Sequence, residues 1–475
     1  MIITQTEQRE AKGKALALGL VVAAFMAACL LLAATPAHAA TTFTVNKTGD
    51  APDRNIGNGK CDSSRKSGSQ CTLRAAIQEA NATIAADTIK FKIPTSAPNC
   101  DATTKVCTIT PASALKITEP VTIDGYSQPG ASPNTATTGT NAVLKIVISG
   151  INAGTAPGIY VTGSNTTVKG LVIHGFQDTA VILFPDGGQP GGNRLEGSFI
   201  GTDATGTTAV SNVTGVLASG FATGSNPSES QNEVVGGDTL AARNLISGNA
   251  TAVDTFFGRA TLEGNLIGTK KDGTTNLGNG FAVRVTGSNN IIEGNTIAHS
   301  SFDGVEIRPL DSTDTSTGNR ILSNSIFENG GPFANNLGID LDPNGVNPND
   351  GGDGDTGPNN LQNYPVITSA KEVSPAIGTD VQFSLNSTSN TAFTIQFFGS
   401  PAADSSGYGE GKTFLGEMQV TTDGTNNTGT KTFTTDHSAA SEGNFVTATA
   451  TNNATGDTSE FSQARVVEGP VIGGG

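Results

Sequence analysis

A six-residue motif with a central isoleucine recurs along the middle of this chain. In each copy the isoleucine follows a short stretch that contains a polar residue or a glycine, as in G-L-V-I-H-G and G-N-L-I-G-T. Successive isoleucines are 27, 46, 21, 30 and 29 residues apart. They are Ile173, Ile200, Ile246, Ile267, Ile297 and Ile326. A repeat of this length indicates stacked supersecondary units, each burying its apolar face against the next.

Three short strands can be written for each repeat between about residues 165 and 342, and each strand contributes one apolar column. The isoleucines form the second column. The first column is Val168, Leu195, Val234, Leu262, Ile292 and Ile321. The third is Val181, Val216, Val253, Val283, Val305 and Ile339. Stacked parallel coils need such columns. With two earlier coils, the pattern predicts an all-β, right-handed parallel β-helix (a pectate-lyase-like solenoid) of roughly eight coils, on the order of 40 Å long.

The first 39 residues are typical of a secretory signal peptide. Three basic residues precede an apolar run over residues 15–34, and Ala37-His38-Ala39 is a small-x-small cleavage site. A membrane anchor is the alternative, but no basic stop-transfer cluster follows the run. We therefore expect a protein that is secreted or held at the cell surface, with no membrane segment after cleavage.

The charge balance narrows the range of partners. The chain has a net charge of -15, which disfavours nucleic acid and anionic membrane as partners. It also disfavours polyanionic polysaccharides, unless a local basic spot reverses the sign. Tryptophan is absent, which removes the largest side chain on which a sugar ring stacks.

Residues 40–117 are predicted to form an N-terminal cap. Leu73, Ala76, Ile77 and Ala80 follow helical spacing, and Thr72 is a suitable N-cap. A helix laid across the end of a solenoid closes its apolar core, which would otherwise promote aggregation. Cysteines in this segment can form disulfides in an exported protein, and sequence-local pairing needs the least rearrangement. The local pairs are Cys61 with Cys71, and Cys100 with Cys107.

Three strings of this chain resemble bacterial secreted β-helix proteins that carry Cys-Ser-Leu-Arg-Glu-Ala near the mature N-terminus. The corresponding string is Cys71-Thr72-Leu73-Arg74-Ala75-Ala76. V-T-I-D-G-Y-S-Q-P-G (121–130) and the G-T-D-A-T-G-T-T loop are also similar to this family. Ala75 replaces the glutamate of the family's capping box, so the helix start should be weaker. The resemblance implies the fold and export, and implies little about activity.

Asparagines and insertions add a second periodic signal. Asn244, Asn265, Asn295 and Asn324 occupy one position in four successive coils, where their amides can bond along the stack. Matching insertions at 201–212 and 268–279 are either simple hairpins or a binding rim.

The composition changes after Tyr364-Pro365. Segments of alternating polarity, separated by Gly, Asn and Asp turns, predict an immunoglobulin-like β-sandwich over residues 365–468. The β-helix is accordingly placed at 118–364 and a flexible tail at 469–475.

Charged residues on the third strand column are the best candidates for chemistry. Asp254, Arg284, Glu306 and Asp340 each stand beside a buried column residue, so they should be neighbours on one outer face about 4.8 Å apart. Arg308 and Phe256 should flank them. Paired carboxylates beside an arginine can act as general acid and base on a sugar chain. The alternative is a solvated ladder of alternating charge that only suppresses wrong association.

A cation site is the second candidate. Residues 340–345 match the opening of a calcium loop, D-x-[DN]-x-[DN]-G, but Gly351 stands where the closing glutamate belongs. The alternative is an acidic, glycine-rich linker. The expected calcium ligands are Asp340, Asp342, Asn344, Asp350, Asp353 and Asp355.

Enzyme signatures of this fold are missing from the sequence. There is no G-H-G pattern with paired aspartates, and no R-x-P-x-x-R. His174 and His299 follow column isoleucines and are interpreted as turn or surface residues. We expect a non-catalytic exported protein that binds polysaccharide or cell-surface glycans. The alternative is a polysaccharide lyase or glycoside hydrolase acting through Asp254, Arg284, Glu306 and Arg308; a self-assembling matrix component is a third hypothesis.

Overall fold

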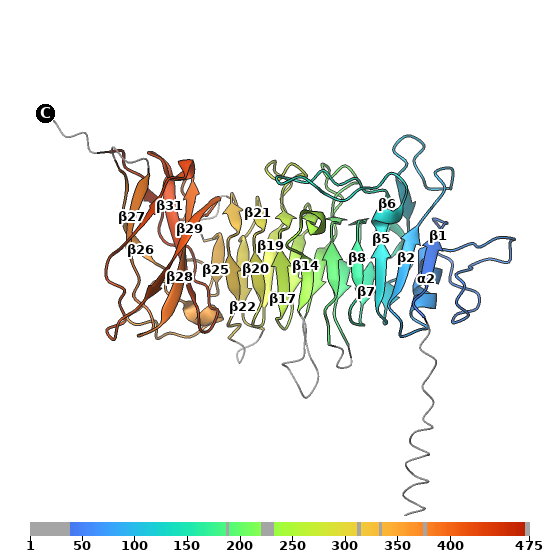
Figure 1. Cartoon of the computed structure of the whole chain (residues 1–475), viewed down its shortest axis with the longest axis horizontal. Helices are drawn as coiled ribbons and strands as arrows, with labels where there is room; N and C mark the ends of the chain where they lie inside the picture. The colour runs from blue at the N-terminus through green and yellow to red at the C-terminus, as the bar shows by residue number, and fades with distance from the viewer. Residues whose placement is uncertain are drawn as a thin grey trace, which may run out of the picture. The chain divides into compact units, whose positions relative to one another are not determined.

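Three long parallel sheets wind around a common core in the computed structural model (Figure 1). The structure describes residues 39–186, 190–219, 232–310, 315–331, 335–373 and 378–470. Within these residues the first sheet contains β1 (Thr42–Val45), β2 (Asp87–Phe91), β5 (Val121–Asp124), β8 (Thr167–Lys169), β11 (Arg194–Glu196), β14 (Glu233–Gly236), β17 (Ala260–Glu263), β20 (Ile291–Glu293) and β23 (Arg320–Leu322).

The second sheet contains β3 (Cys107–Ile109), β6 (Ile146–Ser149), β9 (Val172–His174), β12 (Phe199–Ile200), β15 (Leu245–Ile246), β18 (Leu266–Ile267), β21 (Thr296–Ala298) and β24 (Ser325–Phe327). The third contains β4 (Leu115–Ile117), β7 (Ile159–Val161), β10 (Thr179–Leu183), β13 (Thr214–Ala218), β16 (Thr251–Thr255), β19 (Phe281–Thr286), β22 (Val305–Arg308) and β25 (Ile339–Leu341). The chain visits the sheets in this order, so β2 to β25 form a right-handed parallel β-helix of eight described coils.

The strand register confirms the second and third predicted columns. Ile200 pairs with Ile173 on one side and Ile246 on the other, and the series continues to Ile326. The first column needs one correction. Leu195 pairs with Val235, and Val235 is buried, whereas Val234 pairs with Arg194 on the outer face. Successive side chains of a strand point to opposite faces of the sheet. Val234 was predicted to be the buried residue, but the adjacent Val235 takes that place and Val234 points outward.

A short helix covers the N-terminal end of the core. Helix α2 (Leu73–Ala80) begins after Thr72, whose hydroxyl accepts a 3.1 Å hydrogen bond from the Ala75 amide. Its buried face joins the same apolar cluster as the solenoid columns. The structure pairs Cys61 with Cys71 and Cys100 with Cys107. The first complete coil, β2 to β4, already lies within residues 40–117.

Asparagine ladders run along the corners of the solenoid. The Asn244, Asn265, Asn295 and Asn324 side chains bond in series, each amide donating to the next carbonyl at 2.9 Å. A second ladder, absent from the sequence interpretation, joins Asn212, Asn249 and Asn279. These buried side-chain amides form hydrogen bonds with backbone groups at the turns. Those backbone groups lie between strands, so the hydrogen bonds of the sheets do not pair them.

Loops cover the outer face of the second sheet. The two insertions are antiparallel hairpins, with bridges between Thr202 and Ala209 and between Thr269 and Asn276. They pack with the loop that precedes β6 over a satellite apolar cluster. That cluster contains Ala142, Leu144, Val147, Val172, Phe199, Leu245 and Leu266. The first and third sheets therefore provide the outer faces available to a ligand.

An antiparallel sandwich follows the solenoid, as predicted. One sheet has the order β26 (Val366–Glu372), β27 (Thr379–Ser384), β30 (Lys431–Thr435). The other has the order β29 (Thr413–Thr421), β28 (Ala392–Ser400), β31 (Phe445–Asn452), β32 (Arg465–Val466). This is an immunoglobulin-like arrangement. Its core includes Phe397 stacked on Phe433, with ring centroids 4.2 Å apart.

The sandwich also closes the C-terminal end of the solenoid. Ile326 of the last second-sheet strand bridges to Gly411. The Ile321 amide donates to the Thr458 hydroxyl, and the Leu341 amide to the Glu460 carboxylate. Two sandwich rings, Phe398 and Phe461, belong to the solenoid core cluster. Each of the three sheets therefore ends on a group supplied by the sandwich.

The segment interpreted as a signal peptide lies almost entirely outside the described residues, as do the last five residues of the tail. In the part of the chain that is described, no helix is long and apolar enough to cross a membrane.

Candidate functional site

The outer face of the third sheet carries the predicted row of charges. Asp254 pairs in register with Arg284, Arg284 with Glu306, and Glu306 with Asp340. The row continues toward the N-terminus through apolar and aromatic residues. These are Leu217, Ile182 and Tyr160. The four charged side chains are therefore brought together by strands that lie side by side in successive coils.

Asp254 and Arg284 form an ion pair at the centre of this row. Arg284 Nη2 lies 2.5 Å from Asp254 Oδ2, and both side chains are mostly buried. The guanidinium also lies over the Phe281 ring, 5.0 Å from its centroid. Ion pairing and the ring hold the guanidinium plane in one orientation.

An aromatic pair adjoins the ion pair. The rings of Phe281 and Phe302 stack with centroids 4.3 Å apart and planes 13° apart. Phe302 is 41% exposed, so part of this ring is accessible to a ligand. Sequence reasoning missed this pair because Phe281 stands two residues before its column valine and Phe302 stands three before. The turn before β22 differs in length from the turn before β19, so the two rings do not occupy equivalent positions in the repeat.

Glu306 is half-buried and incompletely paired. Its Oε2 atom is buried and makes no hydrogen bond within the described structure. Burial raises the pKa of this carboxyl, and the nearby Arg308 opposes that increase. A carboxyl whose protonated form is favoured can donate a proton, which is the property a general acid requires.

Asp340 occupies its predicted register position but is not available to a ligand. The side chain is 1% exposed, and its Oδ2 accepts a 3.0 Å hydrogen bond from the Gly345 amide. Burial raises its pKa to about 8, and the charges of Asp303 and Glu460 add to this effect. The expectation of four exposed charges is therefore wrong for Asp340, because the segment after β25 folds back over it.

The two predicted flanking residues lie beside the row. Arg308 pairs in register with Thr286 at the end of β22, and Phe256 follows β16. Both side chains are half-buried. The site thus combines two guanidiniums, two partly buried carboxylates and a partly exposed aromatic pair. Asp303 and Asp342 are also close enough to Glu306 to raise its pKa.

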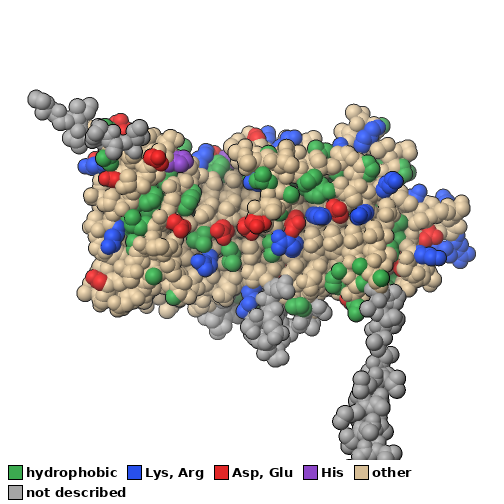
Figure 2. Space-filling view, viewed as in Figure 1, with side chains coloured by type: hydrophobic (Ala, Val, Ile, Leu, Met, Phe, Trp, Pro, Cys, Tyr) green, Lys and Arg blue, Asp and Glu red, His purple; other side chains and the backbone are tan. Residues whose placement is uncertain are grey.

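The outer face of the first sheet carries a different row, shown in Figure 2 as acidic and basic side chains along the solenoid. The register aligns it across successive coils. Its charged residues are Lys90, Asp124, Lys169, Glu196, Glu263 and Glu293, and Gly236 of β14 separates Glu196 from Glu263. None of these residues is aromatic, and they fit the interpretation as a solvated charge ladder. The third-sheet row differs from this first-sheet row in two ways. It adjoins the stacked rings of Phe281 and Phe302, and the buried Oε2 of Glu306 has no hydrogen-bond partner among the described residues.

The predicted calcium ligands separate into two groups. Asp350, Asp353 and Asp355 each offer one carboxylate oxygen within 4.8 Å of the others. Asp355 Oδ1 is buried without a partner among the described residues, and burial raises the pKa of Asp353 to about 6. Asp342 and Asn344 are exposed, and the buried Asp340 carboxylate is bonded to Gly345. Three hard oxygen donors fit Ca²⁺ chemically.

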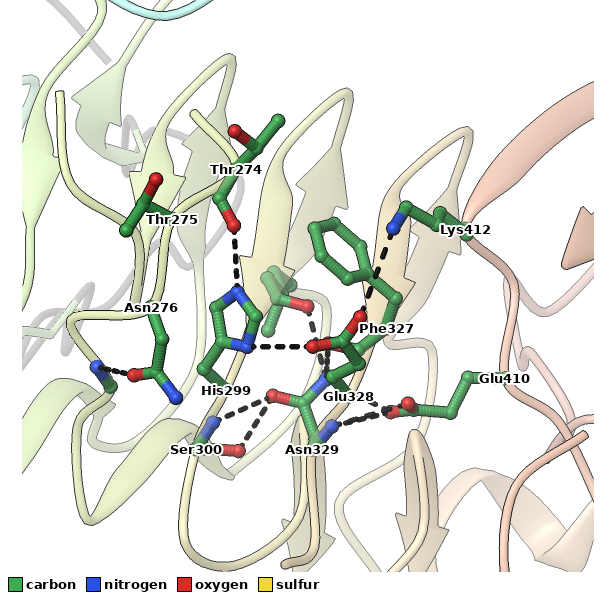
Figure 3. Close-up of polar contacts among 12 residues, drawn as sticks. Thr274, Thr275, Asn276, His299, Ser300, Phe327, Glu328, Asn329, Glu410 and Lys412 are labelled. Carbon is green, nitrogen blue, oxygen red and sulfur yellow. Dashed lines mark hydrogen bonds and ion pairs between the residues drawn. The ribbon is translucent and has the colours of Figure 1, made fainter. Parts of the chain in front are cut away.

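Figure 3 shows a further polar cluster at the junction of solenoid and sandwich. The His299 ring lies between the Thr274 carbonyl, 2.9 Å from Nε2, and Glu328, 3.2 Å from Nδ1. Lys412 lies 3.9 Å from Glu328 and over the Phe327 ring. The His299 side chain is 6% exposed, so it is a buried turn residue that joins a hairpin to the last coil.

No protein-family model matches this sequence, and no curated protein is significantly similar to it. The solved structures to which it is similar include the tailspike protein gp49 of Acinetobacter baumannii bacteriophage Fri1, a capsular polysaccharide depolymerase. It is 11% identical, with 73% of this chain and 71% of that chain covered and a TM-score of 0.19. The Dettilon tailspike protein gp208 is 12% identical, with coverages of 88% and 94% and a TM-score of 0.24. Values this low assign no function to this chain.

Proposed function

We propose that this chain is an exported β-helix protein that binds polysaccharide, including cell-surface glycans, on the outer face of the third sheet without cleaving it. The Phe281–Phe302 stack with Arg284 over one ring carries the proposal. The apolar face of a sugar ring packs on an exposed aromatic face, while fixed guanidinium N–H groups donate to its hydroxyls.

The local charge balance supports a neutral or weakly charged glycan. Asp254 and Glu306 lie among Arg284 and Arg308, and Asp303 and Asp342 are also close to Glu306, so this face supplies hydrogen-bond donors and acceptors without an excess of positive charge. A polyanion would gain little here and would be repelled by the rest of the chain.

Affinity electrophoresis against a panel of neutral and acidic polysaccharides tests the proposal. At least one glycan should retard the protein, and Phe302→Ala and Arg284→Ala should each weaken that retardation about tenfold. Arg194→Ala is the matched control, because Arg194 also pairs with a carboxylate, Glu196, but on the first sheet. Retardation that neither third-sheet variant changes would contradict the assignment of this face.

Polysaccharide cleavage is the second candidate, and Glu306 favours it. A half-buried carboxyl with a raised pKa, next in register to an ion-paired arginine, has the properties of a general acid. New reducing ends or unsaturated uronates that are lost in Glu306→Gln would establish an enzyme. Binding of a glycan with no product from it would support the non-catalytic proposal.

Export is part of the proposal. It is supported by the apolar segment at residues 15–34, the cleavage site after it and two disulfides, which form in oxidising compartments. Expression of the full chain in a bacterium, followed by mass spectrometry of the extracellular fraction, should find a mature N-terminus at Ala40. Recovery of only the uncleaved chain from membranes would contradict export.

We also propose that Asp350, Asp353 and Asp355 bind Ca²⁺ in a structural role. The trio follows the last coil directly, and Asp353 already joins it to the sandwich by accepting a hydrogen bond from Ser387. A cation would neutralise three close carboxylates and stiffen this connection.

A further inference from the structure

A groove of about 1020 Å³ lies at the N-terminal end of the molecule, far along the chain from the third-sheet site. Strand β1 forms one wall, and the loop closed by the Cys61–Cys71 disulfide contributes another. Phe43 and Ile93 lie among its apolar lining residues. Neither the proposed glycan site nor the proposed calcium site uses any of these residues.

Strand β1 presents an unpaired edge to this groove. Among the described strands, the first sheet extends one strand further than the other two, so β1 has a described neighbour, β2, on one side alone (Figure 1). Thr41 and Val45 accept hydrogen bonds from β2 and the residue after it, which directs alternate backbone groups toward β2. The amide and carbonyl groups of Thr42 and Thr44 therefore point away from β2. Across the described residues, no hydrogen bond involves them.

The groove is basic although the chain is acidic. Lys60, Lys66 and Lys92 line it, and the single acidic lining residue, Asp62, accepts hydrogen bonds from Ser64 and Gln70 of its own loop. Residues 40–117 hold ten lysines and arginines against six aspartates and glutamates. Residues 118–475 hold fourteen lysines and arginines against thirty-four aspartates and glutamates. Positive charge is thus concentrated at the end where the strand edge is open.

We propose that this groove binds an extended acidic peptide of a partner protein, which adds to β1 as a further strand. The outward amide and carbonyl groups of Thr42 and Thr44 supply the main-chain hydrogen bonds of strand addition. Alternate apolar side chains of the peptide extend the apolar layer of Phe43 and Ile93, which are 4% and 2% exposed, and its carboxylates face the three lysines. This proposal is independent of glycan binding by the third sheet.

The strand edge favours a peptide over an anionic polysaccharide. Donors and acceptors alternate along β1 with the two-residue spacing of a strand, about 6.6 Å, which an extended peptide matches along its whole length. A sugar chain could use the lysines but would leave most of these groups unpaired, at a cost for each buried group.

Fluorescence anisotropy with a labelled synthetic peptide of alternating valine and glutamate tests the proposal on the exported chain. The peptide should bind, and a peptide of alternating valine and lysine should not. Thr44→Pro removes one outward amide without removing a bond to β2, and proline is tolerated on edge strands. We expect it to weaken binding about tenfold, whereas Thr44→Ala, which keeps the amide, should bind normally.

A combined Lys60→Gln, Lys66→Gln, Lys92→Gln variant supplies a second route if Thr44→Pro does not fold by circular dichroism. It should lose most of the affinity and the salt dependence of binding. Absence of peptide binding to the wild-type chain would overturn the proposal, as would equal binding by Thr44→Pro and Thr44→Ala. Self-association of the lysine variant without peptide binding would show that the lysines only protect the edge. Displacement of the peptide by an oligouronate at lower concentration than by unlabelled peptide would assign the groove to a glycan.

Discussion

Glu410 of the sandwich accepts a 2.9 Å hydrogen bond from the side-chain amide of Asn329 in the last solenoid turn (Figure 3). Asn329 also accepts from Ser300 of the coil before it. The carboxylate therefore terminates a corner ladder of side chains, in the place that an asparagine of a further coil would occupy. The sandwich is thus a cap as well as a module, since it satisfies groups that an ending solenoid leaves open.

We expect the stability of this junction to depend on pH. Burial raises the pKa of Glu410 to about 8 and that of Glu460 to about 7. Both values lie above those of the unfolded chain, so the folded state holds these protons more tightly. Stability should fall as the pH rises from about 5 to 8. In thermal unfolding scans, Glu410→Gln should flatten this fall, because glutamine is neutral at every pH.

Glu442→Gln is the matched control for that experiment, because Glu442 is an exposed carboxyl of the same sandwich. It should leave the slope of stability against pH unchanged. A slope in Glu410→Gln as steep as in the wild type would show that Glu410 is ionised in the folded protein across this range.

Two glycines should differ in their tolerance of alanine. At Gly268 (φ +85°) an added Cβ would collide with the Ala298 carbonyl of the next coil, whereas at Gly294 (φ +63°) it meets nothing within 4 Å. Gly268→Ala should lower the unfolding free energy by about 3 kcal/mol or more. Gly294→Ala should cost about 1 kcal/mol, from the left-handed backbone alone. Urea denaturation measures both, and equal costs would indicate that the coils are not stacked in this register.

The asparagine ladder should contribute to stability at each step. Asn265 is 1% exposed, donates to the Val235 carbonyl and to Asn295, and accepts from Asn244. Asn265→Ala leaves these buried groups unpaired and should cost about 2–3 kcal/mol in urea denaturation. Asn276→Ala, in an exposed hairpin, should cost less than about 0.5 kcal/mol. Similar costs for the two variants would show that the ladder is dispensable.

Calcium should raise the melting temperature of the chain. A ligand at a hundred times its Kd stabilises the folded state by about 2.7 kcal/mol. Asp355→Asn should abolish this increase and should slightly stabilise the calcium-free protein, because it removes one of three close carboxylates. Asp342→Asn changes an exposed carboxyl of the preceding turn and should retain the full response. A calcium response that persists in Asp355→Asn would place the ion elsewhere.

The third-sheet face was predictable in part. Asp254, Arg284 and Glu306 follow column residues at a constant offset, so the repeat alone places them in one row. Phe302 stands three residues before its column valine and Phe281 stands two before, so the repeat does not align them, and their stack depends on how the turn before β22 folds. The burial of Asp340 also escapes the repeat, because the residues that cover it follow the last repeat and have no counterpart in earlier coils.

The solenoid itself can be read from the amino-acid order, because each coil packs on the next and like residues such as Ile246, Ile267 and Ile297 meet at a fixed interval. Its ends cannot be read in this way. The contact between Asn329 and Glu410 joins residues 81 positions apart, and β1 is the outermost strand of the first sheet among the residues that the structure describes. Such features arise from the meeting of segments that share no repeat, so only the folded arrangement establishes them.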